Sequence, residues 1–177
     1  MKDRVEILIS GFGGQGVVRL GQIFGLAAVK QDYRVTMLKS HGTEQRGGYV
    51  RAQVIVSREA IDSPIVEAPD FFCAFSTPAY NRHVDSVRHG VIFYDPSSTE
   101  IDEEKAKKIT HYSVAARDIA IEKLGQSIYA NSIMLGAMVR KIDVMDKDGL
   151  LSAMLEAMPR FKEENRRAFQ IGYELIG

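Results

Sequence analysis

A glycine-rich segment near the amino terminus has the composition of a phosphate-binding turn. Residues 11–16 read GFGGQG and lie between an apolar run at residues 4–10 and a segment with helical apolar spacing at residues 16–31. In a strand-to-helix turn, glycines let the backbone approach a ligand closely, and the free N–H groups of the helix start favour an anion. The predicted ligand-binding residues of this turn are Gly11, Gly13, Gly14, Gln15 and Gly16.

The segment that follows does not complete a dinucleotide-binding pattern. Such a unit places an acidic residue at the end of its second strand, about 20 residues after the glycines, where it binds the ribose hydroxyls. The second strand is predicted over residues 33–40, and it ends in Lys39 and Ser40. Lys39 is suited to a ribose phosphate instead. The alternative is a tight turn that serves only packing, because such turns recur in α/β folds without a ligand.

A second glycine-rich segment begins directly after this strand. Residues 41–48 read HGTEQRGG, in which Glu44 and Arg46 carry opposite charges and Gly47 and Gly48 leave the backbone accessible. If the first two strands run in the same direction, both glycine-rich loops emerge at one edge of the sheet and form one site. The predicted site therefore also includes Glu44, Arg46, Gly47 and Gly48. The alternative is a hairpin connection with solvated or self-paired side chains.

Length and charge exclude several classes of protein. The 177 residues fit one domain spanning residues 1–177, and 23 basic residues balance 23 acidic ones. A chain without net charge has no general field that attracts nucleic acid or a membrane surface. The sequence has no run of about 18 apolar residues and no signal-like segment, so we expect a cytoplasmic protein without membrane contact.

Side chains that usually bind metals or form covalent intermediates do not cluster in the sequence. Cys73 is the single cysteine, and one thiol excludes an internal disulfide and cannot by itself hold an iron–sulfur cluster or a structural zinc. The flanking phenylalanines predict a packed thiol on a buried strand. The histidines show no metal-ligand spacing. We therefore predict no metal site and no catalytic residue on this chain.

The hydrophobic patterns predict an α/β fold: a single domain with a mainly parallel sheet, flanking helices and a helical C-terminal third. The predicted strands cover residues 4–10, 33–40, 49–57, 70–76, 91–96 and 109–114. The predicted helices cover residues 16–31, 77–90, 115–125, 131–142, 146–158 and 161–176. Asn131 is the predicted N-cap of its helix, and the last two helices are predicted to cover one face of the sheet.

Several segments, taken in order, resemble the gamma subunit of 2-oxoacid:ferredoxin oxidoreductases. They are GFGGQGV, HGTEQRGG, IDSPIV and the pair NSIMLGAMVRKI and EENRRAFQIGYE, and together they span nearly the whole chain. The resemblance implies an enzyme that decarboxylates a 2-oxoacid on thiamine diphosphate and passes electrons through iron–sulfur clusters to ferredoxin. The acyl group is then transferred to coenzyme A, which is a substrate.

The resemblance also implies how the work is divided among subunits. This chain alone binds no cofactor, while thiamine diphosphate, Mg and the iron–sulfur clusters lie on partner subunits. The implied partners are alpha and beta subunits that bind thiamine, a ferredoxin-like delta subunit or domain, and ferredoxin as electron acceptor. We expect the isolated chain to be inactive and to expose an apolar surface that the complex buries, or that a homodimer covers in isolation.

The second glycine-rich segment departs from the family pattern. Many pyruvate and 2-oxoglutarate members have YGPE-x-RGG, whereas this chain has His41, Gly42, Thr43, Glu44 and Gln45 before its arginine. The histidine and glutamine are similar to the indolepyruvate branch, and the glutamate is similar to the others. The sequence therefore leaves the identity of the 2-oxoacid open.

Overall fold

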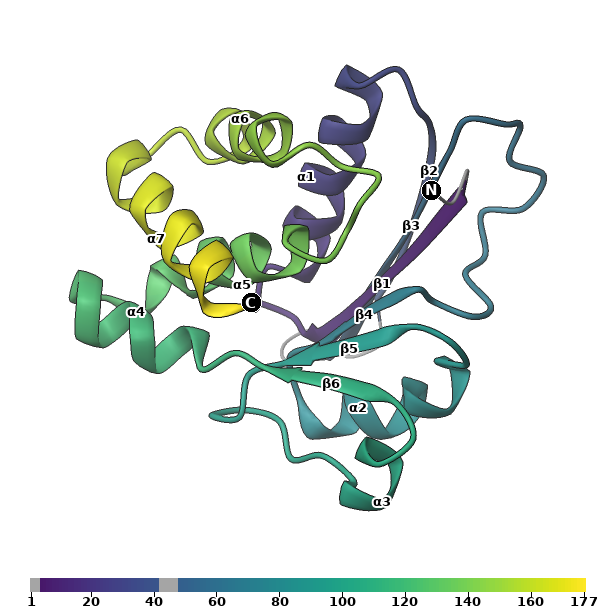
Figure 1. Cartoon of the computed structure of the whole chain (residues 1–177), viewed down its shortest axis with the longest axis horizontal. Coiled ribbons are helices and arrows are strands. Elements are labelled where there is room, and N and C mark those ends of the chain that lie inside the picture. The colour runs from purple at the N-terminus through teal and green to yellow at the C-terminus, as the bar shows by residue number, and fades with distance from the viewer. Residues whose placement is uncertain (1–3, 42–47) are drawn as a thin grey trace.

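The computed structural model describes residues 4–41 and 48–177, which form a six-stranded sheet with helices on both faces (Figure 1). The order of the strands across the sheet is β2-β3-β1-β4-β5-β6. The strands are β1 (Arg4–Phe12), β2 (Arg34–His41), β3 (Tyr49–Ser57), β4 (Phe71–Ala74), β5 (Val91–Tyr94) and β6 (Thr110–Ser113). The predicted α/β class and the predicted order of elements are confirmed.

The sheet is mainly parallel, with one reversed strand. β1, β4, β5 and β6 pair in parallel, whereas β3 lies antiparallel between β2 and β1. The reversal has a simple cause: residues 42–48 are too few for the crossover that a parallel neighbour needs. β1 and β2 consequently run in the same direction without being neighbours. Both strands end at the same edge of the sheet, as the sequence predicted.

Helices α1, α5, α6 and α7 lie on one face of the sheet, and α2 and α3 lie on the other (Figure 1). The helices are α1 (Val17–Lys30), α2 (Thr77–His83), α3 (Glu103–Ala106), α4 (Ala116–Leu124), α5 (Ala130–Val139), α6 (Lys147–Ala157) and α7 (Lys162–Leu175). Short 3-10 turns, η1 (Val84–Ser86) and η2 (Ser127–Tyr129), precede β5 and α5. The helical C-terminal third is confirmed, and its last two helices, α6 and α7, lie on one side of the sheet as predicted.

The N-cap predicted at Asn131 is wrong. α5 begins at Ala130, directly after the η2 turn, so Asn131 lies inside the first turn of the helix. Its side chain does not cap the helix, because its Nδ2 donates a hydrogen bond to the carbonyl of Gln15, 3.1 Å away. An expected local contact is thus replaced by one between distant parts of the chain.

The larger part of the core lies between the sheet and the helices α1, α5, α6 and α7. The backbones of α5 and α7 are in contact at Gly136. A Cβ at this position would lie 1.9 Å from the Phe169 carbonyl oxygen, so only glycine allows this close packing. Cys73 on β4 is fully buried in this core, and burial raises the pKa of its thiol. The prediction of a packed thiol is confirmed. Among the helices that the structure describes, none is long and apolar enough to cross a membrane.

Candidate functional site: an open helix start at the sheet edge

Three helices directly follow parallel strands of the sheet, α1 after β1, α2 after β4 and α4 after β6, and the first turns of these three differ. At α2, the hydroxyl of Ser76 accepts a hydrogen bond from the N–H of Ala79 at 3.3 Å. At α4, a carboxylate oxygen of Asp95 accepts one from the N–H of Arg117 at 2.9 Å. α1 has no side-chain cap and no acidic residue in its first turn within the described residues. The start of α1 is therefore the one that remains open to an anion.

The glycines before α1 adopt backbone conformations that other residues avoid. Gly14 has φ 93° and Gly16, the N-cap of α1, has φ 80°, both in the left-handed region. At Gly11 the reason is space, since a Cβ there would lie 2.8 Å from the Cβ of Phe75. The turn therefore requires glycine for backbone conformation at two positions and for close packing at a third.

Gln15 fastens the glycine turn to its surroundings. The N–H of Phe12 donates to its Oε1 at 2.6 Å, and its Nε2 donates to the carbonyl of Phe75 at 2.8 Å. Its own carbonyl accepts the hydrogen bond from Asn131 described above. These bonds tie the turn to the ends of β1 and β4 and to α5. In this structure the Gln15 side chain orients the turn, and its amide oxygen and nitrogen are both already hydrogen-bonded to the protein backbone.

The second glycine-rich segment meets the first one at the same edge. The N–H of Gly13 donates to the carbonyl of Gly48 at 2.9 Å, and Phe12 pairs with Tyr49 in the sheet. Gly13 is one of the predicted ligand-binding residues, and its N–H already has an acceptor in the second segment. Glu44, Arg46 and Gly47 lie outside the described residues.

A hollow of about 530 Å³ lies over the open helix start. Its lining includes Gly13, Gly14 and Gly16 of the turn. Two exposed side chains also line it, Arg19 from the first turn of α1 and His41 from the end of β2. Arg19 was not among the predicted site residues. Its position three residues after Gly16 was a usable signal, because a residue there lies in the first helical turn. Asn131, another lining residue, carried no such signal.

On the other face of the sheet, a hydrogen-bonded pair of side chains anchors the start of β3 to α2. The hydroxyl of Tyr49 hydrogen-bonds with Nε2 of His83, and the guanidinium of Arg82 lies 4.4 Å from the centre of the Tyr49 ring. Burial and the neighbouring Arg51 and Arg82 lower the pKa of His83 to about 4. His83 is therefore neutral at pH 7.

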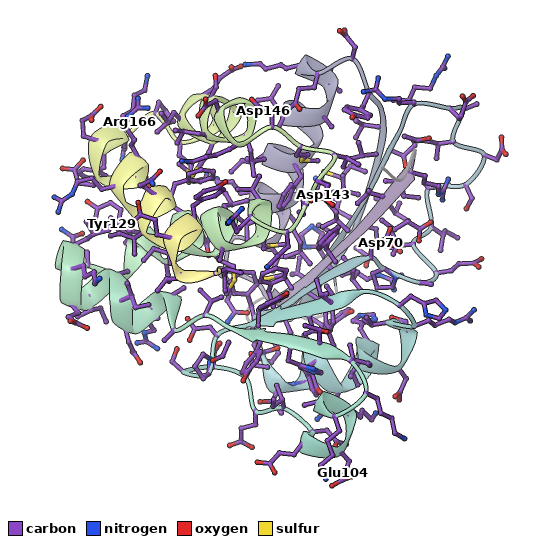
Figure 2. All side chains as sticks on the ribbon, viewed as in Figure 1. Asp70, Glu104, Tyr129, Asp143, Asp146 and Arg166 are labelled. Atoms are coloured by element: carbon purple, nitrogen blue, oxygen red, sulfur yellow. The ribbon has the colours of Figure 1, made fainter. Side chains whose placement is uncertain are left out.

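A second hollow lies at the opposite edge of the sheet. It measures about 310 Å³, and its lining includes Asp70 and Asp143 with apolar side chains from the beginnings of β1, β4 and β5. Figure 2 shows these two aspartates on one side of the molecule and Tyr129 on the other, beside α7. Within residues 4–41 and 48–177, no three His, Cys, Asp or Glu side chains gather in a way that would hold a metal ion.

The family model described as pyruvate ferredoxin/flavodoxin oxidoreductase matches residues 6–175. The chain belongs to this family. The 2-oxoglutarate synthase subunit KorC of Methanocaldococcus jannaschii is 36% identical over 178 residues, which cover 99% of this chain and 95% of that protein. The family resemblance seen in the sequence is thereby confirmed. The GFGGQG turn would also suit a stand-alone nucleotide-binding or sensor module, but that alternative finds no support in these matches.

Solved structures share the fold over the whole chain. The gamma subunit of a keto/oxoacid ferredoxin oxidoreductase from Geobacter sulfurreducens superposes with a TM-score of 0.80 at 29% identity and covers 97% of both chains. A 2-oxoglutarate:ferredoxin oxidoreductase from Magnetococcus marinus, solved with 2-oxoglutarate, coenzyme A and succinyl-CoA, has a TM-score of 0.87 at 23% identity. That match covers 99% of this chain and 31% of the longer one, and it shows the common fold.

Proposed function

We propose that this chain acts as the gamma subunit of a multi-subunit enzyme that converts a 2-oxoacid and coenzyme A into acyl-CoA and CO₂ while reducing ferredoxin. The observation that carries this proposal is the family match over residues 6–175, joined by a gamma-subunit fold along the whole chain. The single cysteine, buried Cys73, supports placing the iron–sulfur clusters on other subunits. Thiamine diphosphate and Mg are proposed for the alpha and beta subunits.

Within this complex, the open start of α1 is proposed to contact the phosphates of coenzyme A. The N-terminal end of a helix carries a partial positive charge, and α1 leaves its first turn without a side-chain cap. The guanidinium of Arg19 and the ring of His41 line the same hollow and supply further donors. Arg46, which belongs to the second glycine-rich segment, is proposed to complete this set.

The test uses the complex assembled by coexpression with thiamine-binding subunits. Arg46→Ala and Arg19→Ala should each raise the KM for coenzyme A or slow acyl transfer by roughly tenfold, about 1.4 kcal/mol, because each removes a charge-assisted contact to phosphate. The decarboxylation step, measured without coenzyme A, should change less. Arg58→Ala is the matched control, since Arg58 follows β3 at its other end and packs on the ring of Tyr33.

Two outcomes would contradict the proposed contact or the proposed complex. Unchanged coenzyme A kinetics together with weaker subunit association would make these arginines interface residues and favour a purely structural role. Ferredoxin reduction by the isolated chain, or stoichiometric iron in it, would contradict the proposed division of cofactors.

A further inference from the structure

Another hollow, distinct from the one at the opposite edge of the sheet, adjoins the hollow over the glycine turn. It measures about 380 Å³ and lies between the η2 turn and the beginning of α7. Both hollows include Arg19, Ile128 and Met158 in their linings, so they lie next to each other. We call the hollow at the beginning of α7 the α7 groove and define it by Ile128, Tyr129, Met158, Arg160 and Phe161.

Phe161 occupies this groove in a backbone conformation that is unfavourable for a residue with a Cβ. It has φ 54° and ψ 48°, in the left-handed region, and it is the residue from which α7 begins. Its ring meets Tyr129 edge-on with the centroids 6.3 Å apart, yet 52% of Phe161 remains exposed. Strained residues of this kind concentrate where a protein binds something.

A buried polar network holds the strained residue in place. The hydroxyl of Ser132 donates to Oδ1 of Asn165 at 2.7 Å, and both residues are buried. The Nδ2 of Asn165 donates to the carbonyl of Arg160 at 3.0 Å, and its N–H donates to the carbonyl of Phe161 at 2.9 Å. These bonds fix the turn to α5. The exposed ring is thus presented on a rigid support, which lowers the entropic cost of binding.

The charged residues in the lining of the groove are both arginines. Arg19 and Arg160 are both exposed, and within residues 4–41 and 48–177 neither guanidinium makes an ion pair. Ile128, with 58% of its surface exposed, belongs to the same lining. An apolar floor with arginines at its rim is complementary to a polypeptide that places a bulky apolar side chain beside carboxylates.

We propose that the α7 groove docks a segment of a thiamine-binding partner subunit, in which an aromatic or large aliphatic side chain contacts Phe161 and Ile128 and a neighbouring carboxylate pairs with Arg160. This proposal rests on the proposed function, because it takes its partner from that complex. The groove shares Arg19, Ile128 and Met158 with the hollow over the glycine turn, so docking here places the partner subunit beside the open start of α1.

The test measures the Kd of this chain for the thiamine-binding subunits and compares four variants, each coexpressed with those subunits. Phe161→Gly should raise the Kd at least tenfold while leaving the Tm of the isolated chain unchanged or higher, because glycine accepts the left-handed backbone. Arg160→Glu should raise the Kd at low salt, with a smaller effect at high salt. Ile65→Gly and Arg58→Glu, exposed residues between β3 and β4, are the controls and should leave the Kd unchanged.

Each alternative result is distinguishable. Assembly of Phe161→Gly and Arg160→Glu with unaltered Kd would overturn the docking proposal and leave the proposed function standing. A raised KM for coenzyme A with unaltered Kd would make the groove part of a small-molecule site and overturn the docking proposal. Loss of self-association by Phe161→Gly, with the partner Kd unchanged, would assign the groove to a second copy of this chain. Failure of the unaltered chain to assemble would overturn the proposed function and the docking proposal with it.

Discussion

The neighbouring parallel strands β1 and β4 each lead into a helix at the same edge of the sheet, and the two helix starts are built differently. Ser76 caps α2 with its own hydroxyl, and Pro78 follows in the first turn. α1 starts from Gly16 without a side-chain cap. Gln15 and Asn131 instead hold the turn before α1 through hydrogen bonds to the surrounding backbone.

The difference separates a structural turn from a candidate binding turn. A capped helix satisfies its first N–H groups locally and has little to offer a ligand. An uncapped start held by outside contacts keeps its shape and leaves those donors available. α4 belongs with α2 in this respect, because Asp95 takes the N–H of Arg117. Substitutions at these three helix starts should therefore have different consequences.

The largest effect is expected at Gly16. Gly16 and Gly125 have nearly the same left-handed φ, 80° and 79°, but a Cβ at Gly16 would lie 2.3 Å from Nδ2 of Asn131, whereas Gly125 has no atom within 4 Å. Gly16→Ala should therefore lower the free energy of unfolding by about 3 kcal/mol and Gly125→Ala by about 1 kcal/mol. Urea denaturation measures both. Equal losses would show that the contact with Asn131 does not constrain the turn.

A smaller loss is expected when α4 loses its cap. Asp95 is 5% exposed and also accepts the N–H of Ser97 at 2.9 Å, so Asp95→Ala leaves two donors without their acceptor. The free energy of unfolding should fall by about 2 kcal/mol. Asp95→Asn, which keeps an acceptor, should lose less. The KM for coenzyme A should not change, and a change as large as that of Arg19→Ala would remove the distinction between the two helix starts.

Removal of the cap of α2 should have a lesser effect again. Ser76→Ala should lower the free energy of unfolding by about 1 kcal/mol, because the N–H of Ala79 loses its acceptor in a buried position. Ser76→Gly should cost only a few tenths of a kcal/mol. Urea denaturation of the two variants tests this order. A loss larger than that of Asp95→Ala would mean that Ser76 supports more than the first turn of α2.

At the other end of α2, the smallest effect at neutral pH is expected from His83. Its pKa in the folded chain, about 4, lies below the ordinary value of 6.5, so between these values the unfolded chain binds a proton that the folded chain does not. Stability should therefore fall as the pH drops from about 6.5 towards 4, and the ionisation of His83 should not change stability above that range. His83→Gln should lack this acid-dependent loss in thermal melts. An identical pH profile for both proteins would contradict the assignment.

The sequence determined the features that depend on neighbours along the chain. The apolar runs, the glycines before α1 and the helical spacing after residue 115 predicted the elements and their order, because strand and helix periodicity is local. The single cysteine in the sequence also predicted a chain that binds no iron–sulfur cluster by itself. β1 extends beyond its predicted end to Phe12 because that residue pairs with Tyr49 of β3, which the local pattern did not contain.

Tertiary structure decided which of these residues meet and which remain available. Gln15 was predicted to bind a ligand, but its side chain hydrogen-bonds to the backbone of Phe12 and Phe75. The N–H of Gly13 likewise donates to the carbonyl of Gly48. Asn131 lies 116 residues after Gln15 in the chain and reaches it only because α5 packs beside the glycine turn. Hydrogen bonds between segments so far apart have no periodic signature in a single sequence, because they depend on how the elements pack and not on the spacing within any one of them.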